Sequence, residues 1–164
     1  MLKIILSVII VATSGYIGLQ INSEYNKKYL FFADFGAFLQ YLSVKIAFFQ
    51  NKFVDCIKGF LEQNSRTNSF YKRLYELVRI QNIDANEIAK IIDINITDAE
   101  KLFISKTIEG IANSNFDSVE KYINGSITEN QLNINKYNNL SNGKGKLIKK
   151  ISVYIGIAIC ILLY

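Results

Sequence analysis

The residues closest to a chemical motif are Gly143-Lys144-Gly145-Lys146, a glycine–lysine run near the C-terminal end. Such runs bind phosphate when a strand precedes them and their spacing is GxxxxGK[ST], because backbone N–H groups then surround the anion. Neither condition is met here. We therefore interpret the run as a basic connection rather than a nucleotide-binding loop.

The usual catalytic groups are missing or isolated. The chain has no histidine, the residue that most often serves as a general base. Cys56 has no imidazole partner and falls on an apolar helical face, so we predict that it packs in a core. Cys160 lies in a terminal apolar segment, so no disulfide is expected. The remaining carboxylates are scattered over helix surfaces, and we expect no enzymatic activity, no cofactor and no metal site.

Two uncharged, largely apolar segments bound the chain and constrain its function more than any other feature. The first covers residues 4–23 and the second residues 151–164. A helix of the first length spans about 30 Å, which matches a bilayer core. We predict a membrane helix at each end, the second beginning at Leu147, with Lys149 and Lys150 extending toward lipid headgroups.

Other interpretations of the two segments remain open. Lys3 and residues 4–12 resemble a signal peptide with a cleavage site at Ala12-Thr13-Ser14, which would make the protein secreted. Apolar residues continue to Ile21, which favours a retained anchor. The second segment is short for a span and could instead be a core or interfacial helix, although it is apolar on every face.

Small residues recur at a four-residue spacing in each segment. Ser14 and Gly18 have this spacing in the first, and Ser152 and Gly156 have it in the second, where Cys160 continues the stripe. Such stripes let membrane helices approach closely. We predict that these serines and glycines form the contact between the two spans or with a partner.

Basic residues flank both segments on the side of the central region. The chain carries 19 Lys+Arg and 14 Asp+Glu, a net charge of +5. The flanking residues are Lys27, Lys28, Lys144, Lys146, Lys149 and Lys150. By the positive-inside rule they place the central region in the cytoplasm, and they predict contact with anionic headgroups or acidic partners. A nucleic-acid partner is not expected, because no aromatic–basic motif of such modules is present.

The central region, residues 24–146, is predicted to be an all-α helical bundle, with residues 1–23 and 147–164 as the membrane helices. Apolar residues recur at helical spacing over residues 30–49, 52–63 and 69–81. The first of these could continue the N-terminal span as one helix. No strand pattern competes with this interpretation.

Helix starts and stops are marked in the second half of the central region. Asp84 with Glu87, and Thr97 with Glu100, have the spacing of capping boxes, which begin helices. A long helix is expected from Phe116 toward the second span. The glycines within residues 138–145 predict a flexible joint there.

Three groups of residues, taken with this layout, resemble a known family. They are Ala12-Thr13-Ser14-Gly15-Tyr16-Ile17-Gly18, then Leu39-Gln40-Tyr41-Leu42 with Lys45-Ile46, and finally Lys149-Lys150 followed by Tyr154-Ile155-Gly156. With an apolar segment at each end and a helical middle, the chain resembles stage III sporulation protein AB of spore-forming Firmicutes. The chain departs from that family's pattern at Lys45, where Glu is typical, and at Phe53-Val54, where Pro-Leu is typical. The family's usual Trp in the middle domain is absent, and its Gly-x-x-Asp-like turn is kept only loosely, in residues 113–117.

The resemblance implies a non-catalytic platform subunit of the channel that links mother cell and forespore during sporulation. Its helical domain would resemble that of type II secretion F proteins, which contact a secretion ATPase. The partners would be other channel subunits, such an ATPase and the lipid bilayer, and the location would be the mother-cell membrane around the forespore. Apart from the resemblance, a small membrane-active protein such as a holin or an immunity protein fits the layout, as does a secreted helical protein.

Overall fold

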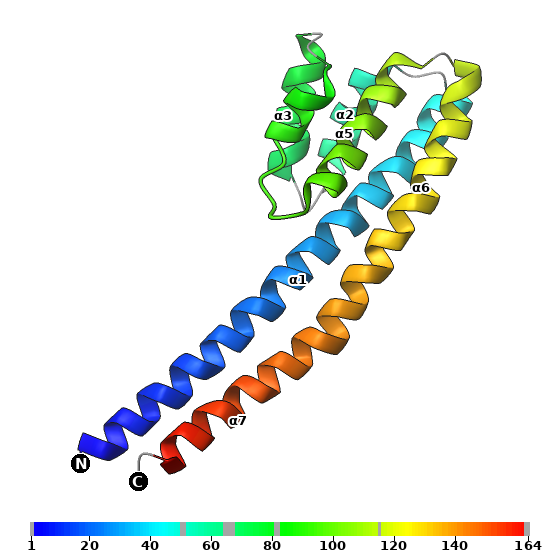
Figure 1. The fold of residues 1–164 in the computed structure, drawn as a ribbon. Helices are drawn as coiled ribbons and strands as arrows, with labels where there is room; N and C mark the ends of the chain where they lie inside the picture. The colour runs from blue at the N-terminus through cyan, green and yellow to red at the C-terminus, as the bar shows by residue number, and fades with distance from the viewer. Residues whose placement is uncertain (1, 50–51, 64–67, 81–82, 115, 163–164) are drawn as a thin grey trace. The chain divides into compact units, whose positions relative to one another are not determined.

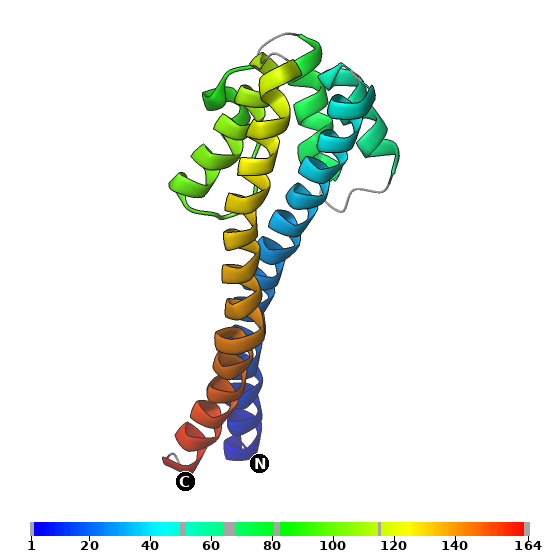
Figure 2. The same ribbon diagram turned by 90° about the vertical axis from the view of Figure 1, so that its right-hand side faces the viewer.

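The computed structural model describes residues 2–49, 52–63, 68–80, 83–114 and 116–162. These ranges hold helices and no strand, so the all-α prediction is confirmed. The elements are α1 (Leu2–Phe49), α2 (Phe53–Glu62), α3 (Asn68–Arg79), α4 (Ala85–Lys90), α5 (Asp98–Asn113), α6 (Phe116–Asn139), the π-helix η1 (Leu140–Gly145) and α7 (Lys146–Leu162) (Figures 1 and 2). The sequence also predicts a polar break at residues 64–68, of which the structure describes only Asn68, the first residue of α3.

Helix α1 runs from the apolar N-terminal segment into the central region without a break, as the sequence had suggested. The chain contains no proline, so nothing removes a donor from its hydrogen-bond ladder. Over Leu6–Ile46 it is long and apolar enough to cross a membrane, with a mean hydropathy of 1.3. Only 6% of its most apolar stretch is buried, which leaves these side chains facing outward rather than into a protein core.

The chain divides into two compact units. We call Met1–Tyr29 with Ile134–Tyr164 the helix-pair unit, and Leu30–Asn133 the bundle unit. In the helix-pair unit, α7 lies antiparallel to the N-terminal part of α1 (Figures 1 and 2). Helix α7 has 17 residues, fewer than the about 20 that a span requires, so the structure does not by itself show a second membrane helix.

Phenylalanine rings from α1 form the centre of the bundle unit. Phe35 and Phe38 are both fully buried. The centroid of the Phe38 ring lies 5.1 Å from that of Phe60 in α2 and 4.9 Å from that of Tyr71 in α3. The Phe35 ring packs edge-on against Phe103 of α5, with 6.3 Å between the two centroids. Such pairs contribute about 0.5–1.5 kcal/mol each beyond their buried area. Helix α1 is therefore the element around which α2, α3 and α5 pack.

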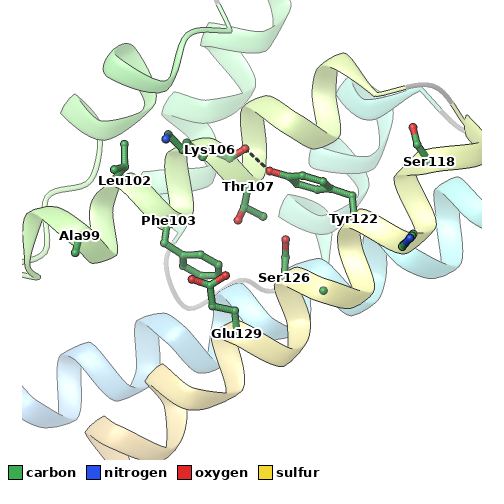
Figure 3. A pocket seen from close by; sticks show the side chains of 11 residues that line it. Ala99, Leu102, Phe103, Lys106, Thr107, Ser118, Tyr122, Ser126 and Glu129 are labelled. Atoms are coloured by element: carbon green, nitrogen blue, oxygen red, sulfur yellow. Dashed lines mark hydrogen bonds between the residues drawn. The ribbon is translucent and has the colours of Figure 1, made fainter.

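Helix α6 is attached to its neighbours in the bundle unit by side chains that reach backbone groups. The buried Asn130 amide donates a hydrogen bond to the carbonyl oxygen of Phe32 in α1, at 2.9 Å. The Tyr122 hydroxyl donates to the carbonyl oxygen of Lys106 in α5, at 3.0 Å (Figure 3). The Tyr122 ring lies across Gly110, where an added Cβ would collide with it. Glycine at that position lets α5 and α6 approach.

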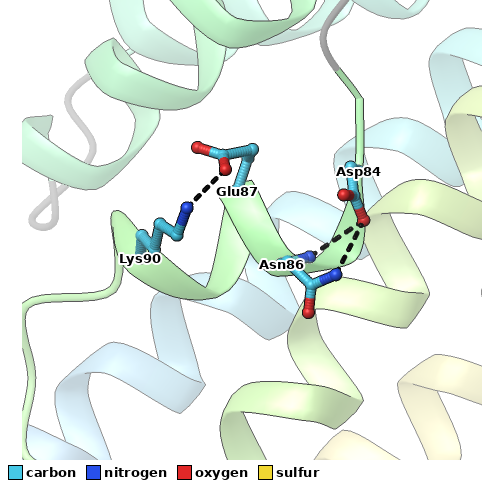
Figure 4. Close-up of polar contacts among 4 residues, drawn as sticks. All are labelled: Asp84, Asn86, Glu87 and Lys90. Atoms are coloured by element: carbon cyan, nitrogen blue, oxygen red, sulfur yellow. Dashed lines mark hydrogen bonds and ion pairs between the residues drawn. The ribbon is translucent and has the colours of Figure 1, made fainter.

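One of the two predicted capping boxes is complete and the other is half formed. Thr97 accepts from the Glu100 backbone while the Glu100 carboxylate accepts from the Thr97 backbone, as predicted. Asp84 caps α4 by accepting from the Asn86 backbone at 3.1 Å (Figure 4). The prediction that Glu87 completes this box was wrong. Its carboxylate pairs with Lys90 one turn later instead, because that ammonium offers a charged partner.

The predicted flexible joint at residues 138–145 is helical. Residues Leu140–Gly145 form η1, a π-helical turn that connects α6 to α7. Glycine weakens an isolated helix, but packing of Gly145 against Asn22 of α1 supports this turn. The chain therefore passes from α6 into α7 through one extended helical path.

Candidate functional site

The small residues that the sequence singled out meet between α1 and α7. A Cβ added at Gly18 would lie 2.9 Å from the Cα of Lys149 and 2.9 Å from the Oγ of Ser152. One added at Gly156 would lie 3.1 Å from the Cβ of Ser14. Both distances are too short for ordinary side-chain contacts. Larger residues at either glycine would push the two helices apart.

Hydrogen bonds accompany this close approach. The Ser14 hydroxyl donates to the carbonyl oxygen of Ser152 on the other helix. The Ser152 hydroxyl donates to its own helix, at the carbonyl oxygen of Ile148, 2.8 Å away. Further along, the Cys160 thiol donates to the carbonyl oxygen of Ser7 at 3.4 Å. The structure thus brings together all the predicted contact residues. Their packing within a membrane belongs to the proposal below.

Three of the predicted flanking lysines share one pocket, and the others lie elsewhere. The pocket has a volume of about 500 Å³ and is lined by Asn22, Lys146, Lys149, Lys150, Val153 and Tyr154. Outside it, Lys27 pairs with Glu24 at 2.8 Å. The Lys28 ammonium lies 5.7 Å from the centre of the Tyr137 ring, and Lys144 is exposed on η1. The flanking charge is therefore divided between a built pocket and separate surface positions.

A groove between α5 and α6 was not predicted. It has a volume of about 750 Å³ (Figure 3). Its lining is Ala99, Leu102, Phe103, Lys106, Thr107, Ser118, Lys121, Tyr122, Gly125, Ser126 and Glu129. Leu102 is 49% exposed and Tyr122 is 39% exposed, so part of each side chain is open to a partner. An added Cβ at Gly125 would meet nothing within 4 Å, so the groove is open there.

Sequence reasoning missed the groove because it depends on which faces of α5 and α6 meet. Helical periodicity marks apolar positions on each helix but does not pair the helices. The one local signal was Gly125, an unexplained glycine inside a helical pattern. A glycine inside a helical pattern is worth examining for a functional reason, and here it leaves the groove open, because an added Cβ would meet nothing within 4 Å.

The cysteine in the bundle unit lies in the core. Cys56 is 1% exposed, which confirms its predicted core position. Burial, and then the charge of Asp55, raises the pKa of its thiol to about 11. The described residues contain no group of His, Cys, Asp or Glu side chains able to hold a metal ion.

Comparison with known proteins places the whole chain in one family. The family model described as stage III sporulation protein AB matches residues 3–164. No curated protein and no solved structure matches the chain. The match agrees with the resemblance seen in the sequence and covers both apolar ends as well as the helices between them.

Proposed function

The chain belongs to the stage III sporulation protein AB family, and from this membership we propose that it is a membrane platform subunit of the mother cell–forespore channel required for endospore formation. The family is one of sporulation proteins not known to be catalytic. The observation that carries the proposal is the match over residues 3–164, because it includes both apolar segments. Scaffolding, rather than catalysis, is then the function.

In this proposal the protein is held in the mother-cell membrane around the forespore. Residues 1–23 and 147–164 cross the bilayer, and residues 24–146 form the cytoplasmic helical domain. The exposed apolar length of α1 supports the first span. The second is supported by the close approach at Gly18 and Gly156, since small residues let spans pack where no hydrophobic effect drives them. The flanking lysines favour the cytoplasmic orientation.

We place the contact with the other channel subunits in the groove between α5 and α6. A secretion-type ATPase is one of these proposed partners. Its exposed Leu102 and Tyr122 fit the apolar face of a partner helix. Lys106 and Lys121 outnumber Glu129 in the lining of the groove. Its net charge is therefore positive, and the partner helix should carry acidic residues beside its apolar face. Binding a partner helix in this way requires only the side chains that line the groove.

Filling the groove tests the proposal. Gly125→Leu places a side chain in the open space, and the helix should become more stable by up to about 1 kcal/mol because a helix-interior glycine is removed. In a deletion strain complemented with this variant, we expect capture of channel subunits and the yield of heat-resistant spores to fall by about tenfold or more, as when an interface centre is blocked.

Asn124→Leu is the matched control, since Asn124 is exposed on the same helix and does not line the groove. It should leave capture and spore yield unchanged. Thermal unfolding of both variants excludes misfolding as the cause. Normal capture and normal spore yield with Gly125→Leu would contradict the placement of the partner. Full spore yield from the deletion strain itself would contradict the proposed role in sporulation.

A further inference from the structure

Three lysines on one face of α7 carry charge that the protein does not neutralise. Lys146, Lys149 and Lys150 are spaced i, i+3 and i+4, so their ammonium groups repel one another. Within the described residues, none of them forms an ion pair with a carboxylate. The acidic residue of α1 within the helix-pair unit, Glu24, is engaged by Lys27. An anion from outside the chain would relieve this repulsion.

The pocket that these lysines line also contains an amide and less polar side chains. Asn22 contributes an amide from α1, while Val153 and Tyr154 follow the lysines one turn further along α7. Tyr154 is 68% exposed, and tyrosine is enriched where a membrane meets water. A ligand with an anionic head and an apolar tail matches this lining, in which the lysines come first along α7 and Val153 and Tyr154 follow.

Asn22 adds a polar group that the protein leaves unused. Its side-chain oxygen is buried against Gly145 and has no hydrogen-bond partner in the part of the chain that the structure describes. Buried polar groups are normally satisfied. Because this oxygen accepts hydrogen bonds, the group that would satisfy it is a donor, such as a head-group hydroxyl or a water, and not a phosphate oxygen. The π-helical turn places Gly145 here, and any larger residue would displace the amide.

We propose that this pocket binds the phosphate headgroup of one anionic phospholipid, with the lysines on the phosphate and the acyl chains along Val153 and Tyr154. Basic pockets between membrane helices bind lipid phosphates in this way. The proposal rests on the membrane-anchored role proposed above and assigns to it a lipid site. Such a site fixes α7 to α1 at the membrane surface and favours membranes rich in anionic lipid.

The test is lipid binding by the purified full chain in zwitterionic detergent, measured by native mass spectrometry. The probes are phosphatidylglycerol and phosphatidylcholine with identical acyl chains, and glycerol 3-phosphate as a soluble competitor. We expect the chain to retain one phosphatidylglycerol about tenfold more strongly than phosphatidylcholine. The soluble phosphate should not displace it, because it lacks the apolar part. Equal retention of the two lipids, or displacement by glycerol 3-phosphate, would overturn the proposal.

Two triple variants separate the pocket from general charge attraction. Substituting Lys146, Lys149 and Lys150 by Gln should abolish the preference for phosphatidylglycerol. Substituting Lys27, Lys28 and Lys144 by Gln removes the same charge outside the pocket and should preserve it. Equal loss in both variants would reject a built site, and circular dichroism verifies that each remains helical. The assay does not depend on sporulation. A chain without lipid preference that still supports spore formation would therefore reject the lipid site alone.

Discussion

Among single residues, Cys56 illustrates how burial suppresses chemistry. The thiolate is the reactive form of cysteine, and in this side chain burial raises the pKa to about 11. At neutral pH almost none of it is ionised. The residue therefore acts as a small apolar group in the core of the bundle unit.

We predict that Cys56 resists alkylation in the folded chain at pH 8 and reacts readily in denaturant, when measured by mass in a Cys160→Ala background. Because the pKa in the folded state exceeds that in the unfolded state, the folded form holds its proton more tightly. The contribution of the protonated thiol to the free energy of unfolding is intact below about pH 9. It is lost as pH rises toward 11, by up to about 3 kcal/mol. In Cys56→Ala, this part of the fall in unfolding free energy between about pH 9 and 11 should be absent. Equal reaction rates in the folded and denatured chain would contradict the prediction.

The contacts of single residues could be predicted from the sequence where all the groups involved lie within one helical turn. Thr97 and Glu100 satisfy each other across one turn, so their spacing was sufficient to predict the capping box. Asp84 was predicted correctly as a cap. The partner of the Glu87 carboxylate was not predicted correctly. The capping pattern considers only the residues at the start of the helix, whereas Lys90, three residues further on, forms an ion pair with this carboxylate. The burial of Cys56 followed from its place on an apolar helical face.

At the scale of elements, the pairing of α1 with α7 depends on two glycines. Gly18 and Gly156 each lie where an added Cβ would press on the opposite helix. The stripe of small residues predicted which faces meet. The π-helical turn was not predictable from the sequence, because the glycines there signal a weak helix and only the contact of Gly145 with Asn22 explains why it stays helical.

We predict that Gly156→Leu separates α7 from α1 and prevents assembly with partners, while the bundle unit stays folded. The leucine side chain cannot fit beside Ser14 and Val11. The measurements are recovery of channel subunits with the tagged variant and helicity by circular dichroism. Gly143→Leu is the control, since nothing lies within 4 Å of an added Cβ at Gly143. Unchanged recovery with Gly156→Leu would refute this role.

At the scale of the whole molecule, the first and last segments of the chain belong to one unit, and the helices between them belong to another. The apolar ends and the polar, helical middle were visible in the sequence because hydropathy and periodicity are local properties. The groove between α5 and α6 and the lysine pocket were not, since each is made by side chains from two helices. The family match joins these parts into one sporulation protein.

The most direct measurement is the location of a functional fluorescent fusion in the protein's own host during sporulation. A membrane subunit of the mother cell–forespore channel should concentrate in the membrane that engulfs the forespore, and intact mass should show that residues 1–23 are retained. A uniform signal in vegetative membranes, or a secreted product lacking its first segment, would contradict the central claim.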